Sequence, residues 1–163
     1  GIRWLKAQAW VDGAHVGVFG WSYGGYMTTM LLAKASEQIT AGVAVAPVTD
    51  WTLYDTFYTE RYLSTPQENK AGYIRSAPFA WLDGLSSPLF LVHGMADDNV
   101  LFSNTTALMA ELQTRGVQFD LMTYPGGKHG LSTTTMKLHA YHAIVNWMDR
   151  HLKPAAANQA GGP

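Results

Sequence analysis

Apolar residues alternate along the chain between short dense runs and longer runs with helical spacing. The short or alternating runs predict four strands, at residues 16–20, 41–48, 88–94 and 117–124. Helical spacing predicts helices at residues 2–9, 24–36, 103–116 and 133–152. Residues 51–75 are less regular, rich in aromatic residues and predict short helices. Strands that alternate with helices are typical of an α/β fold, with a parallel sheet covered on both faces.

The end of the chain is patterned differently from the rest. In the last predicted helix, one apolar stripe has the spacing 3-4-3-4 and consists of Leu138, Tyr141, Val145, Met148 and Leu152. Residues 154–163 are small and polar and predict a disordered tail, so residues 1–153 form the expected domain.

The first residues resemble neither an initiator segment nor a signal peptide, and four strands make a small sheet for this fold class. We therefore expect a piece of a longer protein.

Size and composition narrow the possibilities. The 163 residues are 47% hydrophobic, enough for one packed domain. Charged residues make up only 14% and the net charge is −1, so nucleic-acid binding is not expected. The absence of cysteine excludes disulfides, thiol catalysis and cysteine metal sites. No apolar run reaches the roughly 18 residues of a membrane span.

One serine stands at the junction of a predicted strand and helix. Ser22 lies in the pattern Gly-x-Ser-x-Gly, between Gly20 and Gly24. The pattern alone is also typical of an ordinary glycine-rich turn. With a strand before it and a helix after it, however, it matches the sharp turn that exposes a nucleophilic serine.

A serine nucleophile needs a base and a carboxylate that orients the base. The loop after the third predicted strand offers Asp97 and Asp98, and the loop after the fourth offers His129. Singly, the aspartates predict a turn or helix cap, and the histidine an exposed loop residue. Together with Ser22 they give the order serine, aspartate, histidine that is expected of α/β-hydrolases.

Two further groups of residues have alternative interpretations. The spacing 3-4-4 would place one set of aromatic residues on a single helix face, as part of the core or as a pocket beside the serine: Trp51, Tyr54, Tyr58 and Tyr62. His93 closes the third strand, where a structural hydrogen bond is expected. His139 and His142 have helical spacing but no third ligand, so we expect neither zinc nor any other metal or cofactor.

Four segments together resemble the dipeptidyl peptidase IV branch of the prolyl oligopeptidase family of serine peptidases. They are GWSYGGY, APVTDWTLYDTFYTERY, HGMADDNV and YPGGKHG. The resemblance runs from about residue 3 to residue 152 and implies the C-terminal half of an α/β-hydrolase fold. It also implies a serine exopeptidase that releases N-terminal dipeptides with penultimate proline or alanine.

The resemblance assigns roles to residues of this sequence. It implies Ser22 as nucleophile, Asp97 rather than Asp98 as acid, His129 as base and the backbone N–H of Tyr23 as an oxyanion donor. Asn99 would hydrogen-bond the substrate carbonyl that precedes the scissile residue. The walls of the pocket for proline or alanine would be Val48, Trp51, Tyr54, Tyr58 and Tyr62.

The family pattern also contains parts that this sequence lacks. They are an N-terminal β-propeller whose glutamates hold the substrate amine, an upstream oxyanion tyrosine and the first strands of the hydrolase sheet. We expect a homodimer, and a periplasmic, secreted or membrane-anchored parent is suggested by the resemblance alone. The alternatives are another serine hydrolase of this fold, an acylaminoacyl peptidase or esterase, or a catalytically inactive self-associating fragment.

Overall fold

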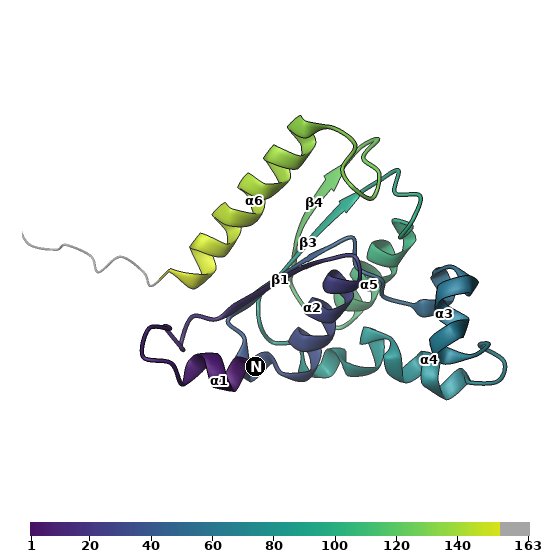
Figure 1. Ribbon diagram of the computed structural model, residues 1–163, viewed down its shortest axis with the longest axis horizontal. Coiled ribbons are helices and arrows are strands. Elements are labelled where there is room, and N and C mark those ends of the chain that lie inside the picture. Colours follow the sequence, from purple (N-terminus) through teal and green to yellow (C-terminus); the bar gives the residue numbers. More distant parts are fainter. Residues whose placement is uncertain (154–163) are drawn as a thin grey trace, which may run out of the picture.

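The computed structural model describes residues 1–153, so the predicted tail, residues 154–163, lies outside the described residues (Figure 1). Its centre is a parallel sheet of four strands in the order β1-β2-β3-β4. The α/β fold predicted from the sequence is therefore confirmed. The strands are β1 (Gly17–Trp21), β2 (Ala41–Val45), β3 (Leu89–Gly94) and β4 (Asp120–Tyr124).

Helices connect the strands, as the alternating pattern predicts. Three short 3₁₀ helices are η1 (Ser36–Gln38), η2 (Trp51–Leu53) and η3 (Pro78–Gly84). The α-helices are α1 (Ile2–Lys6), α2 (Tyr23–Lys34), α3 (Thr56–Leu63), α4 (Lys70–Ser76), α5 (Ser103–Thr114) and α6 (Thr134–Leu152). None of the helices within residues 1–153 is both long and apolar enough to cross a membrane.

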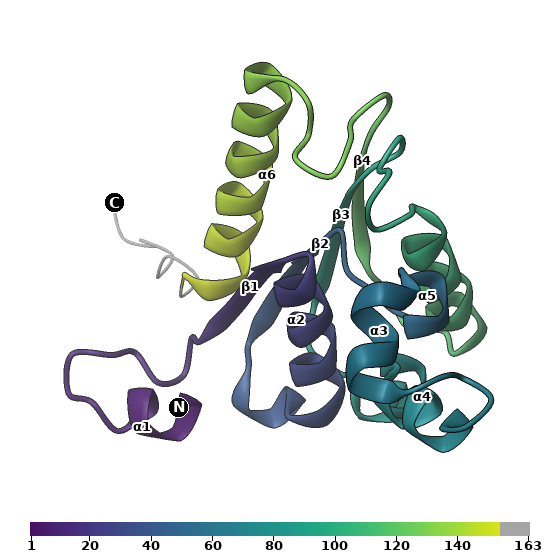
Figure 2. The ribbon, with the colours of Figure 1, turned by 45° about the vertical axis from the view of Figure 1, so that its right-hand side comes forward.

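Two helical layers cover the sheet (Figure 2). Helix α6 packs on one face, where Val43 and Val45 of β2 belong to its core cluster. Helices α2 and α5 and the helix η3 pack on the other face, where Ala44 belongs to the second cluster. Because side chains alternate between the two faces, the fully buried strand β2 is apolar throughout.

Helix α6 buries a face other than the predicted apolar stripe. Its buried residues, also at helical spacing, are Ala140, Ile144 and Trp147. The ring of Trp147 stacks on Phe90, with centroids 5.6 Å apart, and its Nε1 donates to Asp120 at 2.7 Å. These contacts orient the helix, so three members of the predicted stripe are exposed: Leu138, Tyr141 and Val145. Its other two members, Met148 and Leu152, are partly buried against the same core.

Several element boundaries differ from prediction. Helix α1 ends at Lys6 rather than residue 9, and none of its residues is buried. Strand β2 ends at Val45, because Ala46 has a φ of 44° that no regular strand accommodates. Strand β4 begins at Asp120 rather than residue 117. The carboxyl ends of the strands stay where predicted to within three residues, so the loops that carry the candidate site residues are correctly placed.

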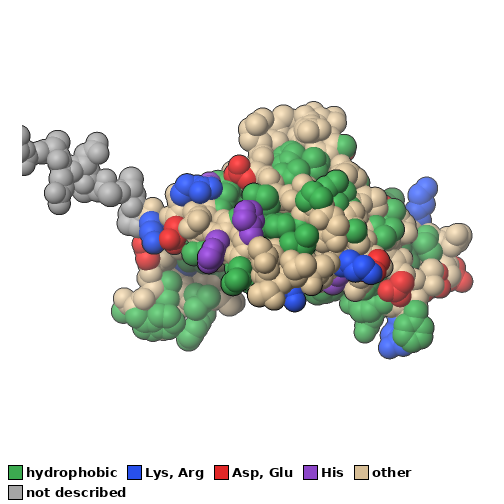
Figure 3. All heavy atoms as spheres, turned by 90° about the horizontal axis from the view of Figure 1, so that it is seen from above, with side chains coloured by type: hydrophobic (Ala, Val, Ile, Leu, Met, Phe, Trp, Pro, Cys, Tyr) green, Lys and Arg blue, Asp and Glu red, His purple; other side chains and the backbone are tan. Residues whose placement is uncertain are grey.

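Part of the apolar surface remains exposed. Among residues 1–153, strand β1 pairs only with β2, and the side chain of Phe19 on it is 46% exposed. Trp4 and Trp10 at the N-terminal end of the chain are also exposed. Figure 3 shows hydrophobic side chains exposed over α6 and at the end of the molecule that carries α1.

Candidate active site

Ser22 lies in a strained turn between β1 and α2. Its φ of 61° and ψ of −118° are unusual for a residue with a side chain. A Cβ at Gly20 would overlap the backbone of Gly24, and a Cβ at Gly25 would lie 2.6 Å from the carbonyl oxygen of Val45. Glycine at positions 20 and 25 therefore lets the helix begin directly against the sheet. The turn has the geometry that the sequence pattern predicts for an exposed nucleophile.

The N-terminus of α2 faces the same edge of the sheet as Ser22. Tyr23 is the first residue of this 12-residue helix, and Ser22 is its N-cap. The first N–H groups of a helix have no partner within the helix, and its dipole favours negative charge there. The backbone N–H of Tyr23 is therefore suited to bind an oxyanion.

The two adjacent aspartates have different surroundings. The Asp97 side chain is fully buried, and its Oδ2 lies 2.8 Å from Nδ1 of His129. Its Oδ1 accepts hydrogen bonds from the backbone N–H groups of Asn99, at 2.9 Å, and Val100, at 3.1 Å. These contacts fix the carboxylate against the imidazole, as in a serine–histidine–aspartate arrangement.

Asp98 pairs with Lys128 rather than with the histidine. Its carboxylate is 62% exposed and lies 2.7 Å from Nζ of Lys128. The hydrogen bond from Lys128 holds the pKa of the Asp98 carboxyl below its usual value. Asp98 therefore ties the two loops together at their surface and does not contact the imidazole.

A tryptophan joins the turn of Ser22 to the loop of His129. The indole Nε1 of Trp21 donates to the carbonyl oxygen of His129 at 3.0 Å. Within residues 1–153 the Ser22 hydroxyl has no hydrogen bond to the imidazole. Such contacts are often long without substrate and shorten when it binds.

The predicted aromatic residues form a pocket beside the serine but do not lie on one helix. Trp51 is in η2, whereas Tyr58 and Tyr62 are in α3, which begins after the helix cap Asp55. The single-helix interpretation is therefore wrong, although consecutive rings still touch, with centroids 5.0–6.0 Å apart. A cavity of about 110 Å³ is lined by Ser22, Tyr23, Val48, Trp51, Tyr54 and Tyr58.

Tyr62 lies outside this small cavity. Its ring packs on Tyr58, with centroids 5.0 Å apart, and its side chain is 68% exposed. It lines a neighbouring cavity of about 320 Å³ together with Tyr23, Trp51 and Tyr58. Tyr62 therefore extends the aromatic surface but does not wall the pocket next to Ser22.

Asn99 is held at the mouth of the pocket by Tyr54. The Tyr54 hydroxyl donates to Oδ1 of Asn99 at 2.9 Å. Burial is the main reason that the pKa of Tyr54 is raised, and the carboxylates of Asp55 and Asp97 raise it further. The phenol thus stays protonated and fixes the amide, and within residues 1–153 the Nδ2 of Asn99 donates no hydrogen bond.

His93 contacts Asp97 of the candidate site, which its position in the sequence did not indicate. It is completely buried, and its Nε2 lies 2.9 Å from the carbonyl oxygen of Val100 and 3.2 Å from Oδ2 of Asp97. Burial lowers the pKa of this imidazole. The only sequence signal was its position four residues before Asp97 at the end of a buried strand.

Three of the four remaining histidines make separate contacts. His15 pairs with Asp12, His139 contacts the hydroxyl of Tyr124, and His151 stacks on Trp147. Among residues 1–153, no three histidine, aspartate or glutamate side chains form a group that could hold a metal ion.

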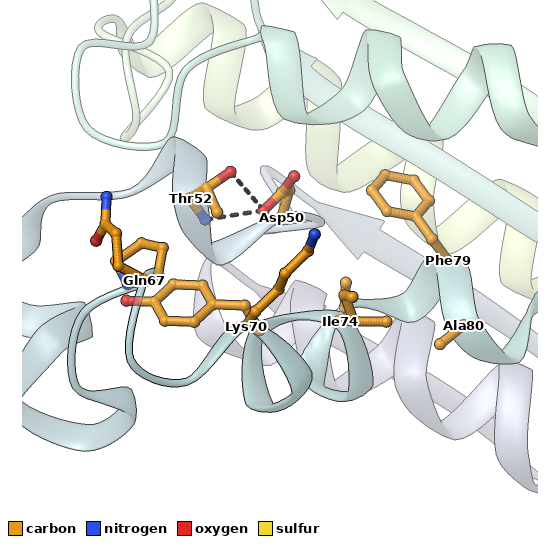
Figure 4. Close-up of a pocket in the computed structure, with 10 residues that line it drawn as sticks. Asp50, Thr52, Gln67, Lys70, Ile74, Phe79 and Ala80 are labelled. Atoms are coloured by element: carbon orange, nitrogen blue, oxygen red, sulfur yellow. Dashed lines mark hydrogen bonds between the residues drawn. The ribbon is translucent and has the colours of Figure 1, made fainter.

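A larger cavity lies away from the serine. It has a volume of about 700 Å³ and includes none of the candidate catalytic residues in its lining. Figure 4 shows Lys70 of α4 extending toward Asp50, while Ile74 and Phe79 form apolar walls. The Oδ1 of Asp50 accepts hydrogen bonds from the backbone N–H and the hydroxyl of Thr52.

The parallel sheet flanked by helices is an α/β-hydrolase fold, which places Ser22 in a strained turn after β1 and the Asp97–His129 pair in the loops after β3 and β4. The model of the prolyl oligopeptidase family matches residues 1–155, and the chain belongs to this family. The resemblance seen in the sequence is therefore confirmed.

Curated relatives and solved structures carry dipeptidyl peptidase names. Proteins named "Probable dipeptidyl-aminopeptidase B" from Talaromyces marneffei and Neurospora crassa are each 40% identical, over 89% and 90% of this chain. The crystal structure of Porphyromonas gingivalis dipeptidyl peptidase 4 superposes with a TM-score of 0.89 and 36% identity, over 93% of this chain and 22% of that chain. The chain spans only 16% of the length of the two fungal relatives.

Proposed function

We propose that this chain supplies the catalytic residues of a serine exopeptidase that releases N-terminal dipeptides with penultimate proline or alanine. The observation that carries the proposal is the buried Asp97–His129 pair beside a strained serine turn and a small aromatic pocket. The names of the relatives support the reaction class.

The contacts suggest the role of each residue. Asp97 accepts the Nδ1–H of His129, which leaves Nε2 unprotonated and able to take the proton of Ser22. Ser22 Oγ then attacks the carbonyl after the second residue, and the Tyr23 N–H stabilises the oxyanion. His129 returns the proton to the leaving amine, and a dipeptidyl ester forms. Water, deprotonated by His129, hydrolyses the ester and releases the dipeptide.

The size of the pocket supports proline or alanine as the residue before the scissile bond. A volume of about 110 Å³ with aromatic walls suits the compact apolar side chain of proline or alanine. The Nδ2 of Asn99 would donate to the carbonyl of the residue before it.

The test is hydrolysis of Gly-Pro-p-nitroanilide by the full-length enzyme and by its Ser22→Ala variant. We expect turnover by the first and almost none by a well-folded variant, because the variant lacks the hydroxyl that forms the ester. Acetyl-Ala-p-nitroanilide and p-nitrophenyl butyrate, tested in parallel, distinguish an acylaminoacyl peptidase or an esterase. Near-normal turnover by the variant would refute Ser22 as nucleophile.

A further inference from the structure

His93 is surrounded by polar contacts although it is completely buried. It lies in β3, one residue before the strand ends. Its Nδ1 is 2.7 Å from the hydroxyl of the buried Thr105, and its Nε2 approaches Val100 and Asp97. The ring also packs edge-on against Phe102, with centroids 5.4 Å apart. The side chain therefore has one position and one set of partners.

These partners determine which nitrogen carries the proton. The carbonyl oxygen of Val100 can only accept, so Nε2 of His93 must donate to it. Because burial disfavours the charged form, the imidazole is neutral and its Nδ1 must accept from Thr105. The Nε2–H is then shared between Val100 and Oδ2 of Asp97.

The Nε2–H of His93 is directed at the Asp97 oxygen that faces the candidate base, His129. Oδ2 of Asp97 is the atom that faces Nδ1 of His129, at 2.8 Å. Oδ1 is already held by the two backbone N–H groups of the loop. His93 is thus the second donor to Oδ2.

We propose that His93 is a positioning residue for the Asp97–His129 pair. Its neutral imidazole donates through Nε2 to Oδ2 of Asp97 and so fixes the direction in which this oxygen accepts from His129. The inference rests on the catalytic roles proposed above for Asp97 and His129. The rival explanation is that His93 only ties the end of β3 to Val100 and Thr105 and has no effect on the pair.

Two amide substitutions separate these explanations. The amide nitrogen of glutamine reaches about as far as Nε2 of histidine, whereas that of asparagine reaches only about as far as Nδ1. His93→Gln therefore keeps a donor to Asp97, and His93→Asn loses it while it keeps a polar group near Thr105. Thr105→Val is the matched control, because it removes a buried hydrogen bond of the same network without touching Asp97.

The first readout is kinetic. Outer partners that orient active groups in metal sites contribute about 10- to 100-fold to activity, and we expect His93→Asn to lower kcat at least about tenfold. The KM for Gly-Pro-p-nitroanilide should change little, because His93 does not line the pocket. His93→Gln should recover most of kcat, and Thr105→Val should keep it. Rates are divided by the fraction of sites that a fluorophosphonate labels, which removes the effect of partial unfolding.

The second readout does not require turnover. The proton between His129 and Asp97 should give a downfield ¹H NMR signal that moves in His93→Asn, returns toward its wild-type position in His93→Gln and stays in place in Thr105→Val. If His93→Asn does not fold, His93→Leu, which also lacks the donor, takes its place. An unchanged signal and an unchanged kcat per labelled site, with only a lower Tm, would overturn the inference. If the wild-type enzyme has neither peptidase activity nor fluorophosphonate labelling, the proposed function fails, whereas the NMR comparison still tests the positioning of Asp97.

Discussion

Asp97 and Asp98 are adjacent in sequence and have opposite environments. Asp97 is buried and receives hydrogen bonds at both oxygens, whereas Asp98 is exposed beside Lys128. An ionised carboxylate is retained in the interior only where hydrogen bonds or charges compensate it. The compensation at Asp97 comes from the loop backbone and the two imidazoles of His93 and His129.

This contrast predicts unequal effects of two isosteric substitutions. Asp97→Asn should lower kcat by about 10⁴-fold, because the amide neither stabilises the His129 imidazolium nor keeps its tautomer. Asp98→Asn should change kcat by less than about tenfold, since its ion pair with Lys128 is exposed and contributes little. Steady-state kinetics with Gly-Pro-p-nitroanilide gives both values. The opposite ranking would show that Asp98 is the acid.

The Tyr54 hydroxyl allows a second test, in which the substitution removes a single oxygen atom. Tyr54→Phe removes the hydroxyl that orients Asn99 and leaves the ring in the pocket wall. We expect a lower kcat/KM for Gly-Pro-p-nitroanilide, by roughly 10-fold, which corresponds to the loss of about 1.4 kcal/mol. Asn99→Ala should have a similar effect, and the double variant should lose no more than either single one, because the two side chains act together. Additive losses would mean that Tyr54 and Asn99 act separately.

Burial of a neutral His93 makes stability depend on pH. The pKa of His93 is lowered in the folded protein from its ordinary value of 6.5. Below about pH 6.5 the unfolded chain therefore binds a proton that the folded chain does not, so acid favours unfolding. The contribution of the neutral His93 to stability is therefore fully present above about pH 6.5 and is lost progressively as the pH falls below that value.

We expect the Tm of the wild type to fall between pH 7 and pH 5, and to fall less in His93→Gln, which has no such group. The carboxyls of Asp12 and Asp98 do not interfere, because their lowered pKa values place their effect below their ordinary value of 3.8. Melts by circular dichroism at several pH values measure the slopes. Parallel curves for the two proteins would contradict the assignment of this pH dependence to His93.

At the scale of elements, the sequence predicted the strands and the loops that follow them better than it predicted the packing of the helices. The four strands were predictable from dense apolar runs, and the rule that loops follow the carboxyl ends of parallel strands brought Ser22, Asp97 and His129 to one edge. The buried face of α6 was not predictable by periodicity alone, because two apolar faces compete and only contact with Phe90 selects one. The contact of His93 with Asp97 depends equally on tertiary structure.

The two faces of α6 predict different responses to truncation. Ile144→Ala should lower the free energy of unfolding by about 2–5 kcal/mol, because Ile144 is 5% exposed within the core cluster. Val145→Ala, its neighbour on the exposed face, should change it by less than about 0.5 kcal/mol. Urea denaturation of both variants compares them directly. A larger loss for Val145→Ala would mean that α6 packs through the stripe first predicted from the sequence.

The aromatic cluster can be tested as a pocket or as core. Tyr58 lies in the wall beside Ser22, and its side chain is 37% exposed. Tyr58→Ala should therefore strongly reduce kcat/KM for Gly-Pro substrates and destabilise the protein by much less than the roughly 3–5 kcal/mol of a buried aromatic truncation. Phe57→Ala, on an adjacent 80% exposed residue, is the control for changes in α3. A large fall in Tm with unchanged kinetics would identify Tyr58 as a core residue.

The molecule as a whole exposes large apolar side chains in three regions. The side chains concerned lie on the free edge of β1, on α6 and at the N-terminal end: Phe19, Leu138, Tyr141, Val145, Trp4 and Trp10. Unpaired strand edges and apolar patches associate readily with other chains. In relatives about six times as long, other parts of the chain are available to cover such surfaces.

We therefore expect the 163-residue chain by itself to self-associate, as a dimer or larger species, and to hydrolyse Gly-Pro-p-nitroanilide far more slowly than the full-length enzyme. In the proposed mechanism Tyr23 supplies one oxyanion donor, and the resemblance implies a second from outside this sequence, whose loss would lower kcat by about 10²- to 10³-fold. Phe19→Lys should shift the chain toward monomer, because a charge on an edge strand opposes pairing, whereas Thr114→Lys at the exposed end of α5 should not. Multi-angle light scattering and the nitroanilide assay measure the two effects independently. A stable wild-type monomer that turns over substrate as fast as the full-length enzyme would show that these residues need no other part of the protein.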